Sequence, residues 1–315
     1  MKPITQEKDR LGFIGIGYMG RPIARRLLES GFSLTAYDRD HTKAEELARY
    51  GGAVTQSVAE LSSSCNVVLS CLPSDAAVLD TYRGPNGVFA HEHPGSVVID
   101  MSTVYPETSQ ELSRLGAERG VEVLDVTISG STPTAENGLL TLFGGGSKER
   151  FDSAESIFRV IAKNYFHLGP SGSGATMKLV VNALLGIGMQ AIAEAVALGE
   201  KAGLDRNCLL DVLSQTAVVA PAHAGKLQRA KKSDYSPQFP IRLMNKDFGL
   251  IFNLAAAVGA RMPAANAAFE INARQSDEGA EQDFSAVILQ MEKQAHLDST
   301  DNSGLESVRE KAGKS

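Results

Sequence analysis

The chain has 315 residues, of which 43% are hydrophobic and 22% are charged, as in globular proteins and unlike disordered or fibrous ones. The formal net charge is −6, and no basic run could follow a phosphate backbone, so we expect no nucleic-acid partner. No window reaches about 20 uninterrupted apolar residues, and the first residues lack a secretory signal pattern. We therefore expect a cytoplasmic protein without a membrane partner.

The first half of the chain alternates short apolar segments with helical patterns. We predict helices over residues 21–30, 41–50 and 106–119, each followed by a glycine that ends the helix. The predicted strands are residues 11–15, 33–38, 66–72, 97–102, 121–126, 139–144 and 164–169. This alternation favours parallel strands with right-handed crossovers, so residues 1–170 are expected to form a doubly wound Rossmann-type α/β domain.

The pattern changes after residue 170. Residues 174–202 are proline-free and rich in Ala, Leu, Val, Ile and Met, which predicts one long helix that is buried on most faces. Further helices are predicted after Asp205, over residues 223–232 and 245–258, after Pro263 and after Asp283. Residues 171–315 are thus expected to form an all-helical substrate and oligomerisation domain.

Two further expectations concern this helical part. Residues 292–315 are polar and lack aromatic side chains, which is typical of a flexible tail. Long apolar helices are usually buried against a partner, so we expect a homodimer or homotetramer.

The first predicted turn carries the sequence GIGYMG at residues 15–20. Its glycines have the GxGxxG spacing of dinucleotide-binding loops, in which Gly15 allows a tight turn, Gly17 lets the pyrophosphate approach and Gly20 lets the helix pack on the strand. The helix N-terminus would supply N–H groups to the phosphates, with Tyr18 and Met19 beside them. A plain glycine-rich turn is the alternative.

Asp38 ends the next strand, near the distance of about 20 residues expected for the ribose-binding acid. A carboxylate accepts hydrogen bonds from both ribose hydroxyls and repels a 2′-phosphate, which favours NAD. The adjacent Arg39 could stack on adenine or meet a 2′-phosphate, so NADP stays possible. Nothing later in the chain suggests a flavin site.

Lys178 and Asn182 are four residues apart in the predicted long helix and therefore share one face. Burial favours the neutral form of a lysine, which could then exchange a proton with a substrate oxygen. A lysine that only covers apolar surface with its stem is the alternative. No histidine or cysteine cluster has ligand spacing, so we predict no metal site.

The chain resembles the β-hydroxyacid dehydrogenase family, which includes 3-hydroxyisobutyrate dehydrogenase and reductases of tartronate semialdehyde, sulfolactaldehyde and succinic semialdehyde. The resemblance spans residues 11–292 and rests on motifs in register. These are GIGYMG (15–20), CLPS (71–74), DMST (100–103), DVTISGSTPTAENGLLTLFGGG (125–146), GATMKLVVN (174–182), NKDFGL (245–250) and QDFSA (282–286).

The resemblance implies roles for single residues around the cofactor. Leu72 and Pro73 would line the nucleotide, and Thr103 would face the nicotinamide. Lys246 would reach the cofactor from the helical domain, with Asp247 supporting it. That domain is expected to be like the C-terminal domain of 6-phosphogluconate dehydrogenase, although shorter.

The same resemblance implies a site for a small carboxylate substrate. Ser129, Gly130 and Ser131 would hold the carboxylate through backbone N–H groups and hydroxyls. Lys178 would be the catalytic acid and base, and Asn182 would orient the substrate.

The chain departs from the family pattern in the segment that would hold this carboxylate. Thr127 stands where the family usually has proline, and Ser131 and Thr134 stand where it usually has glycine. Each change adds a hydroxyl or a Cβ near the carboxylate, so the substrate stays open.

The predicted function is hydride transfer between NAD(P) and a small 3-hydroxy acid or its semialdehyde. One alternative is an enzyme like the imine reductases, although such relatives tend to have Asp or Tyr in place of Lys178. The other is a nucleotide-binding regulator without turnover. Retention of Lys178, Asn182 and Lys246 together disfavours the regulator, because a sensor needs only the nucleotide site.

Overall fold

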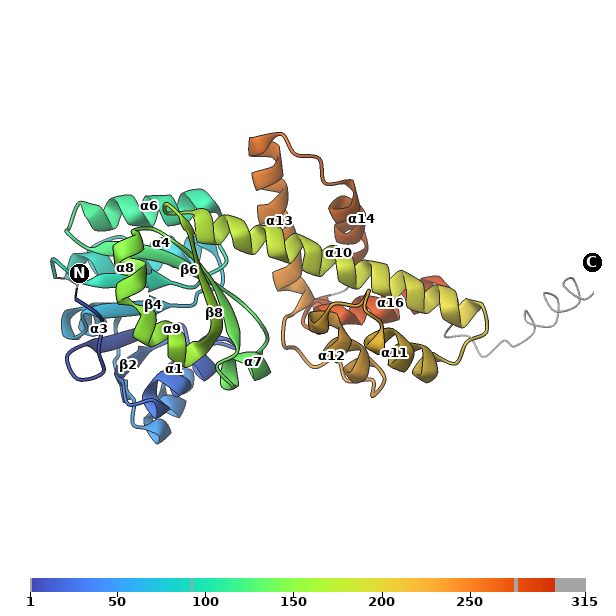
Figure 1. The fold of residues 1–315 in the computed structure, drawn as a ribbon, viewed down its shortest axis with the longest axis horizontal. Helices are drawn as coiled ribbons and strands as arrows, with labels where there is room; N and C mark the ends of the chain where they lie inside the picture. The colour runs from blue at the N-terminus through green and yellow to red at the C-terminus, as the bar shows by residue number, and fades with distance from the viewer. Residues whose placement is uncertain (1, 92, 275–276, 298–315) are drawn as a thin grey trace, which may run out of the picture. The chain divides into compact units, whose positions relative to one another are not determined.

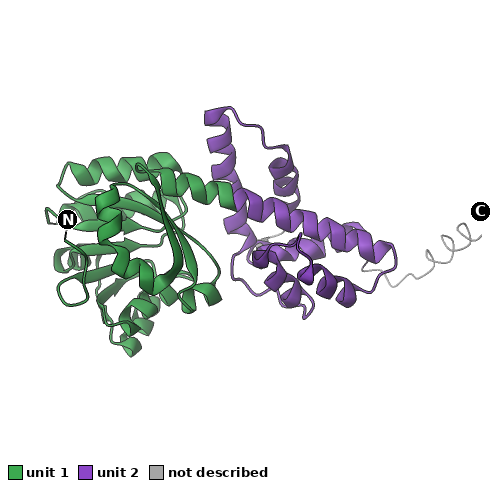
Figure 2. Ribbon diagram, in the orientation of Figure 1, with its two compact units in different colours: residues 1–181 green, residues 182–315 purple. Residues whose placement is uncertain are grey.

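The computed structural model describes residues 2–91, 93–274 and 277–297 (Figure 1). Its contacts define two compact units, residues 1–181 and residues 182–315, here called the sheet unit and the helical unit (Figure 2). The division falls inside helix α10 (Ser173–Lys201), whereas the sequence suggests a boundary at residue 170. The first turns of α10 therefore belong to the sheet unit.

In the described residues, eight strands form one sheet in the order β3-β2-β1-β4-β5-β6-β7-β8. The strands are β1 (Arg10–Ile14), β2 (Ser33–Tyr37), β3 (Ala53–Val54), β4 (Val67–Ser70), β5 (Val97–Asp100), β6 (Glu122–Ser129), β7 (Leu140–Gly145) and β8 (Ala162–Gly169). Strands β3 to β6 are parallel, which confirms the predicted doubly wound sheet.

Strand β7 does not follow the expected parallel pairing. It runs antiparallel to β6, and β8 then pairs parallel with β7. The connection from Ser129 to Leu140 contains only the short helix α7 (Thr132–Glu136), and a parallel crossover needs about a dozen residues or more. The short connection therefore leaves antiparallel pairing as the outcome.

Helices cover both faces of the sheet, as Figure 1 shows. One face packs against α1 (Gly20–Glu29), α8 (Lys148–Ser153) and α9 (Glu155–Ile161). The other packs against α3 (Val58–Ser64), α4 (Asp75–Tyr82), α5 (Val88–His91) and α6 (Pro106–Ala117). Strand residues alternate between the two cores because successive side chains point to opposite faces: Val67 and Leu69 lie in the first and Val68 in the second.

The predicted helix over residues 41–50 is two shorter pieces, α2 (His41–Glu45) and a 3₁₀ helix, η1 (Glu46–Tyr50). Gly51 follows with a φ of 85°, a left-handed conformation that glycine adopts without strain and that ends the helix as predicted.

The described residues of the helical unit form helices, as predicted. After α10 come α11 (Arg206–Gln215), α12 (Pro221–Ala230), α13 (Ile241–Val258), α14 (Pro263–Asn272), α15 (Asp277–Ala280), η2 (Phe284–Ala286) and α16 (Val287–Gln294). Helix α13 begins directly after Pro240, four residues before the predicted start at Asn245. A Cβ at Gly186 would lie 2.4 Å from the Phe248 ring, so α10 and α13 pack closely.

Two expectations need adjustment, the absence of any segment long and apolar enough to cross a membrane and the start of the C-terminal tail. Helix α10 is long and apolar enough, by length and composition alone, to cross a membrane. Half of its apolar stretch is buried inside the protein, as in core helices. The predicted tail starts too early, because α16 continues to Gln294 and Glu292 is buried. Residues 298–315 lie outside the described residues.

Candidate active site

The loop between β1 and α1 is shaped by two glycines. Gly15 has a φ of 93°, and a Cβ there would lie 2.4 Å from the carbonyl oxygen of Cys71. A Cβ at Gly20 would lie 1.9 Å from the carbonyl oxygen of Gly15. Both glycines are therefore required by the close packing of the loop on the strand ends.

Gly17 is different, since apart from its own atoms and its chain neighbours no heavy atom of the described residues lies within 4 Å of the Cβ it would carry. Nothing in the described fold demands glycine there, so the open space beside its backbone suits a ligand. Helix α1 begins next to it without an acidic residue in its first turn and without a side-chain cap from Met19. The N–H groups of that turn can take an anion, so the loop fits the pyrophosphate of a dinucleotide.

Asp38 lies at the end of β2 and is held by the backbone of neighbouring segments. Its Oδ2 accepts a hydrogen bond from the Ile16 amide at 2.7 Å, and its Oδ1 accepts one from the Asp40 amide at 2.9 Å. Each carboxylate oxygen has a second lone pair, which leaves room for ribose hydroxyls. Arg39 beside it is exposed.

Leu72 follows β4 and is fixed by a buried network. The Leu72 amide donates to Ser102 Oγ at 2.8 Å, and the hydroxyls of Ser102 and Ser70 each donate to Asp100 Oδ1 at 2.6 Å. Burial raises the pKa of Asp100 to about 6, although the two serine hydroxyls favour its ionised form. The sequence of the DMST segment points only to Thr103, because the network joins residues 30 apart in the chain.

The loop that follows β6 is held by its own side chains. The Ser131 amide donates to Thr134 Oγ1 at 2.6 Å, and the Thr134 hydroxyl donates to the Ser131 carbonyl at 2.7 Å. The Ser131 amide, predicted to hold a carboxylate, is thus already engaged. Gly130 has a φ of 147°, and a Cβ there would lie 2.5 Å from Thr134 Oγ1, so the turn itself requires this glycine.

Lys178 lies in the sheet unit, one turn after the start of α10, and is partly exposed. Asp125 of β6 fixes that start: Oδ1 accepts from the Gly172 amide at 2.9 Å and Oδ2 from the Ala175 amide at 3.0 Å. Burial raises the pKa of Asp125, and the backbone amides offset part of the rise. Sequence reasoning missed this anchor, because its partners lie about 50 residues further along the chain.

In the helical unit, Asn182 and Asp247 are each 1% exposed, and Asn182 Nδ2 donates to Asp247 Oδ2 at 2.5 Å. Lys246 Nζ lies 2.9 Å from Asp247 Oδ1, which agrees with the expectation that Asp247 supports this lysine. Asn182 Oδ1 is buried and has no hydrogen-bond partner among the described residues. It can therefore accept a hydrogen bond from a ligand.

The structure gathers most of the predicted site residues at one edge of the sheet. They follow the carboxyl ends of the parallel neighbours β1, β2, β4, β5 and β6, which is where doubly wound sheets bind ligands. These residues are Gly15, Gly17, Tyr18, Met19, Gly20, Asp38, Arg39, Leu72, Pro73, Thr103, Ser129, Gly130 and Ser131. Asn182, Lys246 and Asp247 form a second group within the helical unit.

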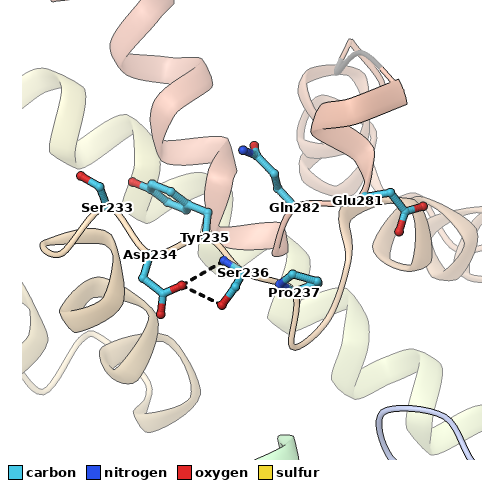
Figure 3. Close-up of a pocket in the computed structure, with 7 residues that line it drawn as sticks. All are labelled: Ser233, Asp234, Tyr235, Ser236, Pro237, Glu281 and Gln282. Carbon is cyan, nitrogen blue, oxygen red and sulfur yellow. Dashed lines mark hydrogen bonds between the residues drawn. The ribbon is translucent and has the colours of Figure 1, made fainter. Parts of the chain in front are cut away.

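A pocket (here called the hollow) of about 460 Å³ in the helical unit is lined by none of the predicted site residues (Figure 3). It is lined by Ser233, Asp234, Tyr235, Ser236, Pro237, Glu281 and Gln282. The Asp234 carboxylate accepts hydrogen bonds from Ser236, and Arg229 pairs with it and holds its pKa well below the usual range. Arg242 pairs with Glu281, so the two carboxylates of this hollow are already neutralised.

The fold and the glycine loop define a dinucleotide-dependent oxidoreductase of the Rossmann class. Residues 10–169 match the family described as the NAD binding domain of 6-phosphogluconate dehydrogenase, and residues 172–291 match that described as the NAD-binding domain of NADP-dependent 3-hydroxyisobutyrate dehydrogenase. The chain belongs to the β-hydroxyacid dehydrogenase family.

Three known proteins illustrate the similarity. Glyoxylate/succinic semialdehyde reductase 1 of Arabidopsis thaliana is 36% identical over 279 residues, which cover 88% of this chain and 96% of that protein. NAD-dependent L-serine dehydrogenase of Pseudomonas aeruginosa is 33% identical over 286 residues, with coverages of 88% and 96%. The structure of Mycobacterium tuberculosis 3-hydroxyisobutyrate dehydrogenase with L-serine matches with a TM-score of 0.78 and 31% identity, over 90% of this chain and 99% of that one.

These findings confirm the predicted enzyme class. The protein is an NAD(P)-dependent oxidoreductase that acts on CH–OH donors and transfers a hydride between NAD(P) and a hydroxy acid or semialdehyde.

Proposed function

We propose that Lys178 is the acid and base of this hydride transfer, and that the substrate is a short carboxylate bearing a hydroxymethyl or aldehyde group. The observation that carries the proposal is the anchoring of α10 on β6. Asp125 ties the first turn of the helix to the strand whose end begins the Ser129–Ser131 loop. Lys178 follows one turn later in the same unit.

Bound NAD(P) supplies the hydride acceptor or donor, and the protein's own groups handle the proton and the carboxylate. In reduction, the Lys178 ammonium donates a proton to the carbonyl oxygen of the substrate. In oxidation, its neutral amine takes the proton of the substrate hydroxyl. The oxidation rate therefore rises with pH, and the reduction rate falls over the same range.

The carboxylate is held by the groups of the β6 loop that remain available. These are the Ser129 hydroxyl and the Gly130 amide, since the Ser131 amide is engaged by Thr134. The Ser131 hydroxyl caps the Thr134 turn as an acceptor, and its own proton can still be donated to the carboxylate. The roles that the family resemblance implies for Asn182 in substrate binding and for Lys246 in cofactor binding stay predictions.

The relatives support the chemical class of the substrate. Their names include glyoxylate, succinic semialdehyde and L-serine, which are small carboxylates with an aldehyde or a hydroxymethyl group. The Asp38 carboxylate favours NAD over NADP, because a 2′-phosphate would meet like charge.

We further propose that the protein is a cytoplasmic homodimer or homotetramer. The helical unit exposes large apolar side chains, and such surfaces are commonly buried between subunits. Leu184 is 70% exposed, Leu198 72% and Val258 69%.

The proposal is tested by turnover of a panel of short 3-hydroxy acids and semialdehydes with NAD and with NADP. Lys178→Ala is expected to lower kcat by about 10²- to 10⁴-fold, the usual worth of a positioned acid and base, with little change in cofactor affinity. Lys201→Ala, an exposed lysine at the end of the same helix, is the matched control.

Lys178→Arg is expected not to restore turnover, because a guanidinium stays protonated and directs its donors differently. Near-normal kcat in Lys178→Ala with a lowered melting temperature would show that the lysine only packs. Cofactor binding without turnover of any panel member would instead support a nucleotide-binding regulator.

A further inference from the structure

Strand β6 carries three polar side chains on one face. Asp125, Thr127 and Ser129 are alternate residues of the strand, and alternate residues of a strand point to the same side of the sheet. Asp125 and Thr127 are 2% and 1% exposed. Asp125 holds the amides at the start of α10, and Ser129 begins the loop that we propose for the carboxylate. Thr127 lies between Asp125 and Ser129 on the same face of the strand.

The Thr127 hydroxyl reaches the same helix. Its Oγ1 donates to the Gly174 carbonyl oxygen at 2.8 Å, while the alternative acceptor, the Phe143 carbonyl, lies 3.5 Å away. In a regular α-helix the carbonyl of residue 174 accepts the amide of residue 178. The hydroxyl therefore binds the carbonyl oxygen that regular helix geometry assigns to the Lys178 amide.

The helix has little room to shift at this point. A Cβ at Gly174 would lie 2.4 Å from the Asp125 carbonyl oxygen and 2.4 Å from the Phe143 carbonyl oxygen. A Cβ at Gly145 would lie 2.5 Å from Asp125 Oδ1. The first turn of α10 is thus seated directly on β6 and β7, with side-chain bonds from Asp125 at its amides and from Thr127 at a carbonyl.

We propose that Thr127 is a positioning residue that fixes the first turn of α10, and with it Lys178, relative to the Ser129–Ser131 loop. Asp125 holds amides at the start of the turn, whereas Thr127 holds the carbonyl oxygen of Gly174. The proposal rests on the function proposed above for Lys178. A displacement of about 1 Å is enough to lower turnover by up to 10²-fold, so a single bond at this place matters.

The experiment compares Thr127→Val, which keeps the shape but removes the hydroxyl, with Thr127→Ser, which keeps the hydroxyl. Thr35→Val, a half-buried threonine in β2, is the matched control. We expect Thr127→Val to lower kcat by about 10-fold with little change in cofactor affinity or KM. Thr127→Ser is expected to restore most of kcat, and Thr35→Val to leave it unchanged.

Amide hydrogen exchange gives a second readout that does not depend on turnover. Thr127→Val is expected to exchange the amides of residues 175–178 faster than the wild-type protein and the Thr35→Val variant do. Thr127→Ser is expected to keep the slow exchange.

The outcomes separate this inference from the proposed function. Unchanged exchange in Thr127→Val overturns the inference whatever the enzyme does. Faster exchange with normal kcat also overturns it, because the turn then need not be fixed for catalysis, while a loss of kcat in Lys178→Ala would leave the proposed function standing. If no panel substrate is turned over, the proposed function fails and the catalytic part of the inference fails with it.

Discussion

The sheet unit and the helical unit hold their buried carboxylates in different ways. In the sheet unit, Asp100 is bonded by serine hydroxyls and Asp125 by backbone amides. In the helical unit, a buried cation is added to bonds of this kind. Asp283 accepts backbone amides and the Ser285 hydroxyl, and Lys226 Nζ lies 2.7 Å from its Oδ2, with both side chains buried. Burial raises the pKa of both Asp100 and Asp125, because dipoles offset only part of the cost of burying a charge.

The difference teaches how each unit keeps its geometry. A carboxylate held by backbone amides fixes the direction of two chain segments, which suits a unit that must place a cofactor loop and a lysine. A buried ion pair carries a large penalty when one partner is lost, since the remaining charge stays buried.

The largest effect is expected from Lys226→Met, which removes the nearer cation of the buried Asp283 and leaves Arg229, whose Nη1 lies 4.0 Å from Asp283 Oδ2. Breaking a buried pair by removing one partner costs about 3–5 kcal/mol of the free energy of unfolding. Urea unfolding measures the loss. Arg242→Met, which breaks an exposed pair with Glu281, is the control and is expected to change stability by about 0.5 kcal/mol or less. Equal losses in the two variants would contradict the comparison.

A smaller loss of stability is expected from Asp125→Asn. An amide group cannot accept hydrogen bonds at both positions, so either the Gly172 or the Ala175 amide loses its partner, at a cost of about 1–3 kcal/mol. Because these amides start α10, kcat should fall more than in Lys226→Met. Asp152→Asn, in an exposed pair with Lys148, is the control. A normal kcat in the destabilised Asp125 variant would show that the anchor serves stability alone.

The smallest effect on stability is expected from the pH-dependent charge of Glu200. Its carboxyl group and that of Glu292 both pair with Arg206. Burial, together with the charge of Glu292, raises the pKa of Glu200 to about 7. A carboxyl whose pKa is higher in the folded state than in the unfolded state stabilises the folded protein. This stabilisation is complete below the unfolded pKa of 4.5 and is lost as the pH rises through the folded pKa of about 7.

Between about pH 5 and pH 8, the melting temperature of the wild-type protein is therefore expected to fall with rising pH by about 2–4 °C more than that of Glu200→Gln. Differential scanning calorimetry across that range measures the difference. Parallel profiles of the two proteins would show that Glu200 does not titrate there.

Much of the fold follows from local pattern, and the failures have physical causes. The strands and long helices were predictable because their apolar periods and terminal glycines act locally. Strand β3 has two residues, too few to show a period. The direction of β7 depends on the length of the connection before it, which the apolar period of the strand does not reveal. The early start of α13 likewise followed from Pro240, a favoured residue beside a helix N-terminus.

The candidate site likewise contains residues that a local motif predicts and residues that only the folded chain brings together. Gly15, Gly17 and Gly20 were predictable because a glycine loop is a contiguous motif. Asp125 and Thr127 were not assigned, since their partners on α10 lie 47 to 50 residues away and only the folded chain brings them together. The engagement of the Ser131 amide by Thr134 depends on the conformation of the turn, which residue identity alone does not give.

The series of Asp125, Thr127 and Ser129 on β6 limits how the chain can change in length. Loss or gain of one residue between them would turn Ser129 to the opposite face of the sheet, while the helix anchors stayed in place. A gain of two residues would keep the face but displace the loop by about 7 Å. Insertions and deletions that accommodate longer or shorter substrates should therefore accumulate after Ser129 and leave the strand itself at constant length.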